Sequence, residues 1–197
     1  MTHATADASL EKATGTLVVV VGPSGVGKDS LMDIARRHFS GRDDVRFVRR
    51  TITRPTDTGG EDHDAASPEA FDRLVASGAF AVSWKAHGLG YGIPLDVRED
   101  LARGRTLIVN GSRSALASVR AAFPDLVVVN VTARADVLAK RLAARGRETA
   151  KQIEARLART TAPLPTDLTI ITIDNSGDLE VAGKELVQLI EELLQSG

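Results

Sequence analysis

A glycine-rich turn between a buried strand and a helix constrains this chain more than any other feature. Residues 22–28 read G-P-S-G-V-G-K, which fits the pattern G-x-x-x-x-G-K. The apolar run Thr16–Val21 predicts a strand buried on both faces, and Asp29–Phe39 has the period of a helix. Glycines let backbone N–H groups wrap around an anion, and the helix N-terminus adds about half a positive charge. The turn therefore predicts a phosphate-binding loop.

Nine consecutive residues are predicted to hold the phosphates of ATP. They are Gly22, Pro23, Ser24, Gly25, Val26, Gly27, Lys28, Asp29 and Ser30. The ammonium group of Lys28 is expected at the β- and γ-phosphates. Position 29, where such loops usually carry Ser or Thr, holds an aspartate. Asp29 suits the positive end of a helix, and its oxygens also suit a metal, so we expect Asp29 and Ser30 to bind the Mg²⁺ of MgATP.

The composition excludes several other classes of protein. The formal net charge of −1 lacks the basic excess of a nucleic-acid or membrane-surface binder. No cysteine is present, which excludes disulfides, thiolate nucleophiles and cysteine zinc sites. No apolar run approaches the roughly 20 residues that span a bilayer. Residues 1–14 have no signal-peptide core and are expected to form a disordered tail. We expect a cytoplasmic protein, and the sequence leaves a homodimer open.

Strand-length apolar runs alternate with helical segments along residues 15–197, which we expect to form one domain. Further strands are predicted at 46–51, 80–84, 106–109, 126–131 and 168–173. Ser67 and Ser112 are each predicted to cap a helix. This pattern indicates an α/β fold, a three-layer P-loop kinase domain whose parallel sheet has helices on both faces and the core order 2-3-1-4-5, extended by the last strand. Segments 22–27, 50–64 and 110–113 follow strands and are expected to meet in one crevice.

A phosphate loop alone does not separate kinases from other nucleotide-hydrolysing proteins. Transfer between two anions requires arginines at the acceptor and over the transferring group, and an ionised acceptor phosphate needs no general base. Arginines occur around 50–95, the predicted acceptor-binding region, and around 141–159, the predicted lid. Arg141 and Arg145 lie one helical turn apart, as a phosphate clamp requires. A solvated helix face is the alternative explanation for each arginine taken singly.

These motifs together resemble the guanylate kinase superfamily and, in detail, its ribose 1,5-bisphosphate phosphokinase family. The resemblance covers nearly the whole chain after residue 14. The matching segments are G-K-D-S at 27–30, R-T-I-T-R at 50–54, G-E-D-H at 60–63, S-W at 83–84, H-G-L-G-Y-G at 87–92, V-N-G-S-R at 109–113, R-L-A-A-R-G-R-E at 141–148 and A-R-L-A-R at 155–159.

The resemblance implies a phosphotransferase that uses ATP and Mg²⁺ on a small sugar phosphate. The implied reaction moves the γ-phosphoryl group in line to the 1-phosphate of ribose 1,5-bisphosphate and gives 5-phosphoribosyl 1-diphosphate. It would serve phosphonate catabolism or the general supply of this product. The residues expected to be catalytic are Lys28, Arg141, Arg145 and Arg156. The residues expected to bind the acceptor are Arg50, Arg54, Glu61, His63, Tyr91 and Arg113.

Three residues of the acceptor region also have a purely structural explanation. His63 is either a loop histidine without a role or a donor to a sugar phosphate, and the sequence does not separate the two. Trp84 is favoured as a core residue over a stacking platform. Arg113 opposes the dipole at the start of its predicted helix, and this local cost favours a role in binding.

Two departures from guanylate kinases argue against GMP as the acceptor. That family is expected to have a guanine-pairing acid at the end of the strand 106–109, where Asn110 stands, and a tyrosine where His63 stands. Without the acid, the donors of guanine are left unmatched. The alternatives are a guanylate kinase or another nucleoside monophosphate kinase and, in another class, a non-catalytic guanylate-kinase-like interaction module.

Overall fold

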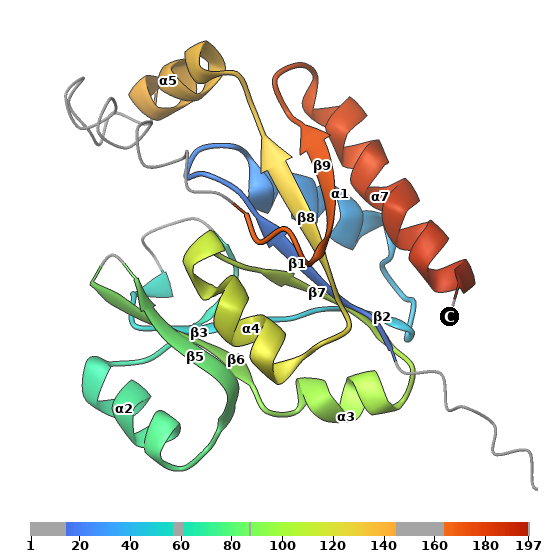
Figure 1. The fold of residues 1–197 in the computed structure, drawn as a ribbon. Helices are drawn as coiled ribbons and strands as arrows, with labels where there is room; N and C mark the ends of the chain where they lie inside the picture. The colour runs from blue at the N-terminus through green and yellow to red at the C-terminus, as the bar shows by residue number, and fades with distance from the viewer. Residues whose placement is uncertain (1–14, 57–60, 87, 145–163, 197) are drawn as a thin grey trace, which may run out of the picture.

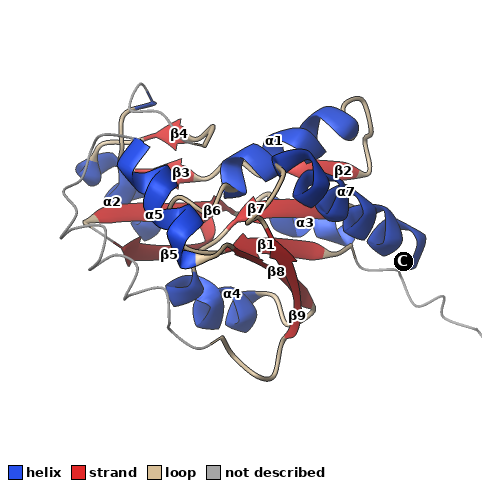
Figure 2. Cartoon of the chain, turned by 90° about the horizontal axis from the view of Figure 1, so that it is seen from above, coloured by secondary structure: helices blue, strands red, loops and turns tan. Residues whose placement is uncertain are grey.

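The computed structural model describes residues 15–56, 61–86, 88–144 and 164–196. In this part of the chain, a five-stranded parallel sheet lies between two layers of helices (Figures 1 and 2). Its order is β2-β7-β1-β8-β9. The strands are β1 (Leu17–Val21), β2 (Val45–Phe47), β7 (Thr106–Asn110), β8 (Leu126–Thr132) and β9 (Thr169–Asp174). The predicted α/β class, with helices on both faces of a parallel sheet, is confirmed.

The central strand β1 contributes side chains to two separate cores. Val18 and Val20 pack with residues of α1 and α7, whereas Leu17, Val19 and Val21 pack with residues of α3 and α4. All five side chains are buried because successive side chains of a strand point to opposite faces of its sheet. The covering helices are α1 (Lys28–His38) and α7 (Leu179–Ser196) on one face, and α3 (Val97–Ala102) and α4 (Leu116–Ala122) on the other.

A second, smaller sheet lies beside the parallel one and is formed by the predicted acceptor-binding region. Its order is β4-β3-β6-β5. The strands are β3 (Thr51–Ile52), β4 (Asp64–Ala65), β5 (Phe80–Ala86) and β6 (Leu89–Pro94). Helix α2 (Pro68–Ala76) packs against it, and Ser67 Oγ accepts a hydrogen bond from the Ala70 amide at 3.1 Å, so the predicted cap is confirmed.

The small sheet corrects two predictions about the strands. The sequence predicts residues 80–84 as a strand of the parallel core, but they belong to β5, which pairs antiparallel with β6. When only the five strands of the parallel sheet are numbered along the chain, β7 is the third and β9 is the fifth. In this numbering their order is 2-3-1-4-5. The predicted strand 46–51 is also divided, since β2 ends at Phe47 and β3 begins at Thr51. Charged Arg49 and Arg50 lie between them, and charges are costly inside a sheet that is covered on both faces.

Strand β6 lies where the sequence predicted a glycine-rich loop. Gly90 and Gly92 leave room for aromatic rings: a Cβ atom would lie 2.8 Å from the ring of Phe71 at the first position and 2.5 Å from that of Phe80 at the second. These glycines mark a close approach inside a strand, which composition alone does not distinguish from a loop.

The helix predicted to start at Ser112 begins differently. A 3₁₀ turn, η2 (Arg113–Ala115), precedes α4, and the Ser112 side chain makes no capping bond. Its hydroxyl lies 2.6 Å from that of Ser114 instead. Helix α5 (Ala135–Ala144) follows β8 and lies near its carboxyl end (Figure 1). The predicted tail 1–14 and the lid residues 145–159 lie outside the described residues. Among the described helices, none combines the length and the hydropathy needed to cross a bilayer.

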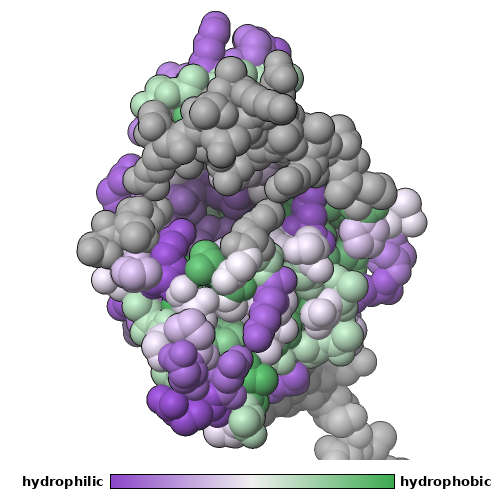
Figure 3. Space-filling model, turned by 90° about the vertical axis from the view of Figure 1, so that its left-hand side faces the viewer, coloured by the Kyte–Doolittle hydropathy of each residue, from purple (hydrophilic) through white to green (hydrophobic). Residues whose placement is uncertain are grey.

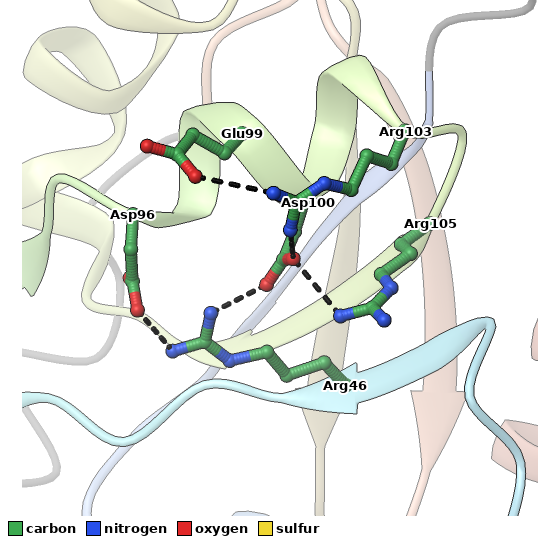
Figure 4. A network of polar contacts seen from close by, with 6 residues as sticks. All are labelled: Arg46, Asp96, Glu99, Asp100, Arg103 and Arg105. Carbon is green, nitrogen blue, oxygen red and sulfur yellow. Dashed lines mark hydrogen bonds and ion pairs between the residues drawn. The ribbon is translucent and has the colours of Figure 1, made fainter.

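A buried carboxylate ties the sheet to α3 (Figure 4). Asp100 is only 4% exposed, and its oxygens lie 2.5 Å from Arg46 Nη1, 3.0 Å from Arg105 Nη1 and 3.5 Å from Arg103 Nη1. Burial acts to raise the pKa of Asp100, but the hydrogen bond from Arg46 and the three positive charges together lower it below its ordinary value. Ionised Asp100 thus holds α3 to the strands β2 and β7.

We expect Asp100→Asn to lower the free energy of unfolding by about 1.5–3 kcal/mol, because a buried carboxylate loses its hydrogen bonds to the charged groups of Arg46 and Arg105, which are themselves partly exposed. The pKa of Asp100 is lowered in the fold, so its contribution is complete above the ordinary aspartate pKa and is lost as the pH falls through the folded value. Stability should therefore depend less on pH below about 4 in the variant. Urea unfolding across this range measures both effects.

Asp96→Asn is the matched control, because Asp96 also pairs with Arg46, at 3.0 Å, but its side chain is 58% exposed. It should cost less than about 1 kcal/mol. Equal losses for the two variants would contradict the role assigned to Asp100.

Candidate active site

The phosphate loop leaves β1 and enters α1, as predicted, and its glycines have backbone angles that other residues rarely adopt. Gly25 and Gly27 have φ angles of +86° and +96°. At Gly27 a Cβ atom would also lie 2.5 Å from Asn175 Nδ2. Both the left-handed backbone and the contact require glycine at position 27.

The Val26 carbonyl of this loop is held by two side chains from other parts of the chain. Asn175 Nδ2, buried after the end of β9, donates to it at 2.7 Å, and Arg141 Nη1, on α5, donates at 3.3 Å. The loop conformation thus depends on contacts with residues more than a hundred positions away. The predicted catalytic residue Arg141 therefore lies against the phosphate loop.

Lys28 begins α1 and reaches back across the loop. Its Nζ donates to the Gly22 carbonyl at 3.0 Å and to the Pro23 carbonyl at 3.4 Å. The positive charge is therefore within the loop itself, as expected for a group that contacts nucleotide phosphates.

A chain of polar contacts joins the start of α1 to the small sheet. Asn110, at the end of β7, donates through Nδ2 to Asp29 Oδ1 at 2.8 Å and to Glu61 Oε2 at 2.5 Å. Glu61 in turn accepts two bonds from Arg50, one of them from Nε to Oε1 at 2.8 Å. Asp29, Asn110, Glu61 and Arg50 thus form a continuous network between the phosphate loop and the predicted acceptor side.

The guanidinium group of Arg50 also lies over two aromatic rings. It is 5.0 Å from the ring centroid of Tyr91 and 5.5 Å from that of Trp84, and the two rings stack with 5.4 Å between centroids and 10° between planes. Arg50 is 5% exposed, so this pairing takes place away from water, where it is strongest. Trp84 therefore does more than fill the core, since it helps to orient Arg50.

His63 is buried, at 1% exposure, and is not an exposed loop histidine. Its Nδ1 lies 2.9 Å from the Glu61 carbonyl oxygen, and its Nε2 lies 2.9 Å from the Arg54 carbonyl oxygen. Both ring nitrogens thus face backbone acceptors, which leaves neither for an acceptor phosphate in this arrangement. The imidazole instead connects the two backbone positions that carry Arg54 and Glu61.

Two further predicted arginines have different surroundings. Arg54 Nε and Nη2 are buried and have no hydrogen-bond partner among the described residues. Arg113 Nη2 donates to Asn130 Oδ1 at 3.0 Å, next to the end of β8. Buried donors without an acceptor are costly, so the Arg54 guanidinium is suited to an anion. The predicted residues Arg145 and Arg156 lie outside the described residues.

The residues around Asp29 fit a magnesium ion bound with a nucleotide. The described residues contain no group of three or more His, Cys, Asp or Glu side chains that could hold a metal without other ligands. Mg²⁺ is usually held by one or two carboxylates, with phosphate oxygens and water completing its shell. Asp29 and Ser30, beside the phosphate loop, supply a carboxylate and a hydroxyl of that kind.

Sequence reasoning missed Asn175 and Asn130. Both lie at or just after the carboxyl end of a strand, and this position could have identified them.

Hydrophilic side chains surround a hollow on the side of the molecule where α2, α5 and the small sheet lie (Figure 3).

Comparisons with known proteins agree with this geometry. The family model of the AAA domain matches residues 18–162. A ribose 1,5-bisphosphate phosphokinase PhnN of Rhizobium etli is 54% identical over 180 residues, which are 91% of each chain. The protein of that name from Agrobacterium fabrum is 52% identical over 176 residues, 89% of this chain and 96% of the relative.

Among solved structures, a guanylate kinase from Anaplasma phagocytophilum matches with a TM-score of 0.62 and 16% identity, over 92% of this chain and 87% of that one. At this identity the match shows the fold alone, and it is the P-loop kinase fold predicted from the sequence. The identity to the curated relatives is far higher and extends over nearly all of both chains. The chain therefore belongs to the ribose 1,5-bisphosphate phosphokinase family.

Proposed function

We propose that this protein transfers the γ-phosphoryl group of MgATP to the 1-phosphate of ribose 1,5-bisphosphate. The products are ADP and 5-phosphoribosyl 1-diphosphate. Family membership supports the reaction, and the buried, unpartnered donor atoms of Arg54 are the observation that carries the acceptor side. An anionic acceptor would supply the oxygen atoms that these donors lack.

The donor half of the reaction uses the phosphate loop. The backbone N–H groups of residues 24–30 would surround the phosphates, and Lys28 would neutralise charge that develops on the β- and γ-phosphate oxygens. Bound through Asp29 and Ser30, Mg²⁺ would supply further positive charge at the same oxygens. Arg141 supports the loop through the Val26 carbonyl, and we propose that Arg145 and Arg156 neutralise the transferring group.

The acceptor half needs position and charge rather than a base. An ionised oxygen of the 1-phosphate attacks the γ-phosphorus as the bond to the bridging β-oxygen breaks, so no proton has to move. We propose that Arg54, Tyr91 and Arg113 contact the acceptor. Arg50 orients Glu61 and the aromatic pair, and His63 holds the backbone of the loop. Such charged metabolites are consistent with the cytoplasmic location that we propose.

The choice of acceptor is tested by a coupled assay of ADP release. We expect turnover with ribose 1,5-bisphosphate and formation of 5-phosphoribosyl 1-diphosphate. Ribose 5-phosphate is the matched control because it lacks the attacking phosphate, and it should give no such product. Faster turnover with GMP would contradict the proposal in favour of a guanylate kinase. No binding of MgATP would indicate a non-catalytic module.

Gly27→Ala tests the phosphate loop. The new Cβ would meet Asn175 Nδ2 and disturb its bond to the Val26 carbonyl, so we expect nucleotide affinity to fall about tenfold or more. Gly41→Ala is the matched control: its φ of +85° imposes a similar backbone strain of about 1–2 kcal/mol, but nothing lies within 4 Å of the added atom. Calorimetric titration with ADP should give an unchanged affinity for the control, and a similar loss in both variants would refute the loop explanation.

Arg54→Ala tests the acceptor contact. We expect KM for ribose 1,5-bisphosphate to rise about tenfold or more, because a hydrogen bond to a charged group contributes about 1.5–3 kcal/mol. KM for MgATP should stay near its original value. Arg42→Ala removes an exposed arginine that pairs with Asp44 and should change neither constant. If Arg54→Ala raised only KM for MgATP, Arg54 would belong to the donor side.

A further inference from the structure

Two residues beside the phosphate loop depart from the usual pattern of P-loop enzymes, and they depart in opposite directions. In P-loop enzymes a Ser or Thr after the lysine and an acidic residue elsewhere hold Mg²⁺. Here the residue after Lys28 is the acid Asp29. Asn110, which is uncharged, ends β7, the strand paired with β1 at Val20↔Asn110. Compared with the usual pattern, position 29 has a carboxylate in place of a hydroxyl. Position 110, at the end of β7, has an amide where a carboxylate could stand.

The two residues are in direct contact, since Asn110 Nδ2 donates to Asp29 Oδ1 at 2.8 Å. We propose an exchange of positions in this chain: the carboxylate that binds Mg²⁺ stands at the start of α1, and an amide stands at the end of β7. In this arrangement Asp29 is the magnesium ligand and Asn110 is the positioning residue that orients it. This inference rests on the MgATP half of the proposed function. It gives Asn110 a task that does not depend on which acceptor is used.

Glu61 provides the physical reason for the exchange. The same Asn110 Nδ2 lies 2.5 Å from Glu61 Oε2, so the two protons of one amide serve two carboxylates. A carboxylate at position 110 would face both acids with no proton between them, and like charges at this distance cannot all stay ionised without cost. Glu61 is fixed by its paired bonds to Arg50. With Glu61 in place, an amide is the group that fits at the strand end.

A simple helix-end charge does not account for the orientation of Asp29. A carboxylate in the first turn is stabilised by the helix dipole wherever it points. The bond to Asn110 instead directs Asp29 towards the end of β7, beside the phosphate loop. The carboxylate is thereby held beside the loop in which we propose that the nucleotide binds.

The test measures how much Mg²⁺ strengthens the binding of a non-hydrolysable ATP analogue, AMPPNP, by calorimetry without any acceptor. Asp29→Asn keeps the shape and removes the charge, so we expect the ratio of the two Kd values, without and with Mg²⁺, to fall about tenfold. Affinity for the metal-free analogue should not fall. Asp33→Asn makes the same change on α1 at an exposed residue and should leave the ratio unchanged.

The exchange itself is tested with Asn110→Asp and with Asn110→Asp combined with Asp29→Ser. Alone, Asn110→Asp should lower the melting temperature, since it brings three carboxylates together. Adding Asp29→Ser removes one of the three carboxylates, so it should recover part of the stability and part of the magnesium effect, although the carboxylate at position 110 still faces Glu61. The changes that the two substitutions cause in melting temperature should therefore not add up in the combined variant, as expected for residues in contact.

Several results would overturn the proposal. An unchanged magnesium ratio in Asp29→Asn would do so, and that variant decides the matter even if the combined variant does not fold. A folded combined variant that bound Mg²⁺ no better than Asp29→Ser alone would also refute the exchange. If the unaltered protein bound the analogue equally with and without Mg²⁺, both the exchange and the donor half of the proposed function would fail. Failure with ribose 1,5-bisphosphate alone would affect only the acceptor half.

Discussion

Five consecutive side chains of β1 have almost no exposed surface, so both faces of the sheet around this strand must be covered. That requirement places α1 and α7 on one side and α3 and α4 on the other. It also brings the carboxyl ends of β1, β7 and β8 to one edge, where Gly22, Asn110 and Asn130 lie close together. The phosphate loop can keep its left-handed glycines because this rigid strand and two side chains from distant segments hold it in place.

The parallel half of the fold could be predicted because its signals are local. An unbroken apolar strand, the glycine pattern and the helix after it are contiguous in sequence, and they correctly predicted β1, the loop and α1. The small sheet was harder to predict. Gly90 and Gly92 look like loop residues until the rings of Phe71 and Phe80 are placed against them. Arg49 and Arg50 likewise divide a segment that had been predicted as one strand.

Several of the residues predicted for the candidate site lie together in the structure, but the contacts that join them could not be predicted from the sequence. Arg50, Glu61 and Asp29 were each expected near a ligand, yet nothing local indicates that Asn110 joins the last two, since Glu61 and Asn110 lie 49 positions apart. His63 shows the limit most plainly. Its type and its neighbours left open whether it contacts a ligand or has no role, whereas its burial and its two carbonyl neighbours favour a role in holding the backbone. Such a role depends on tertiary packing, which spacing does not encode.

The division into two sheets has an evolutionary consequence. Within the part of the chain that the structure describes, the strands β3–β6 share no hydrogen-bonded ladder with the parallel sheet, and Glu61 and Asn110 form a polar contact between the two parts. Val82 and Ile93 share a core with β1, but substitutions elsewhere in β3–β6 can accumulate without changing the backbone that surrounds the nucleotide. A solved guanylate kinase shares this fold at only 16% identity. A lineage could thus acquire a new acceptor by altering one small module, while the donor chemistry was inherited intact.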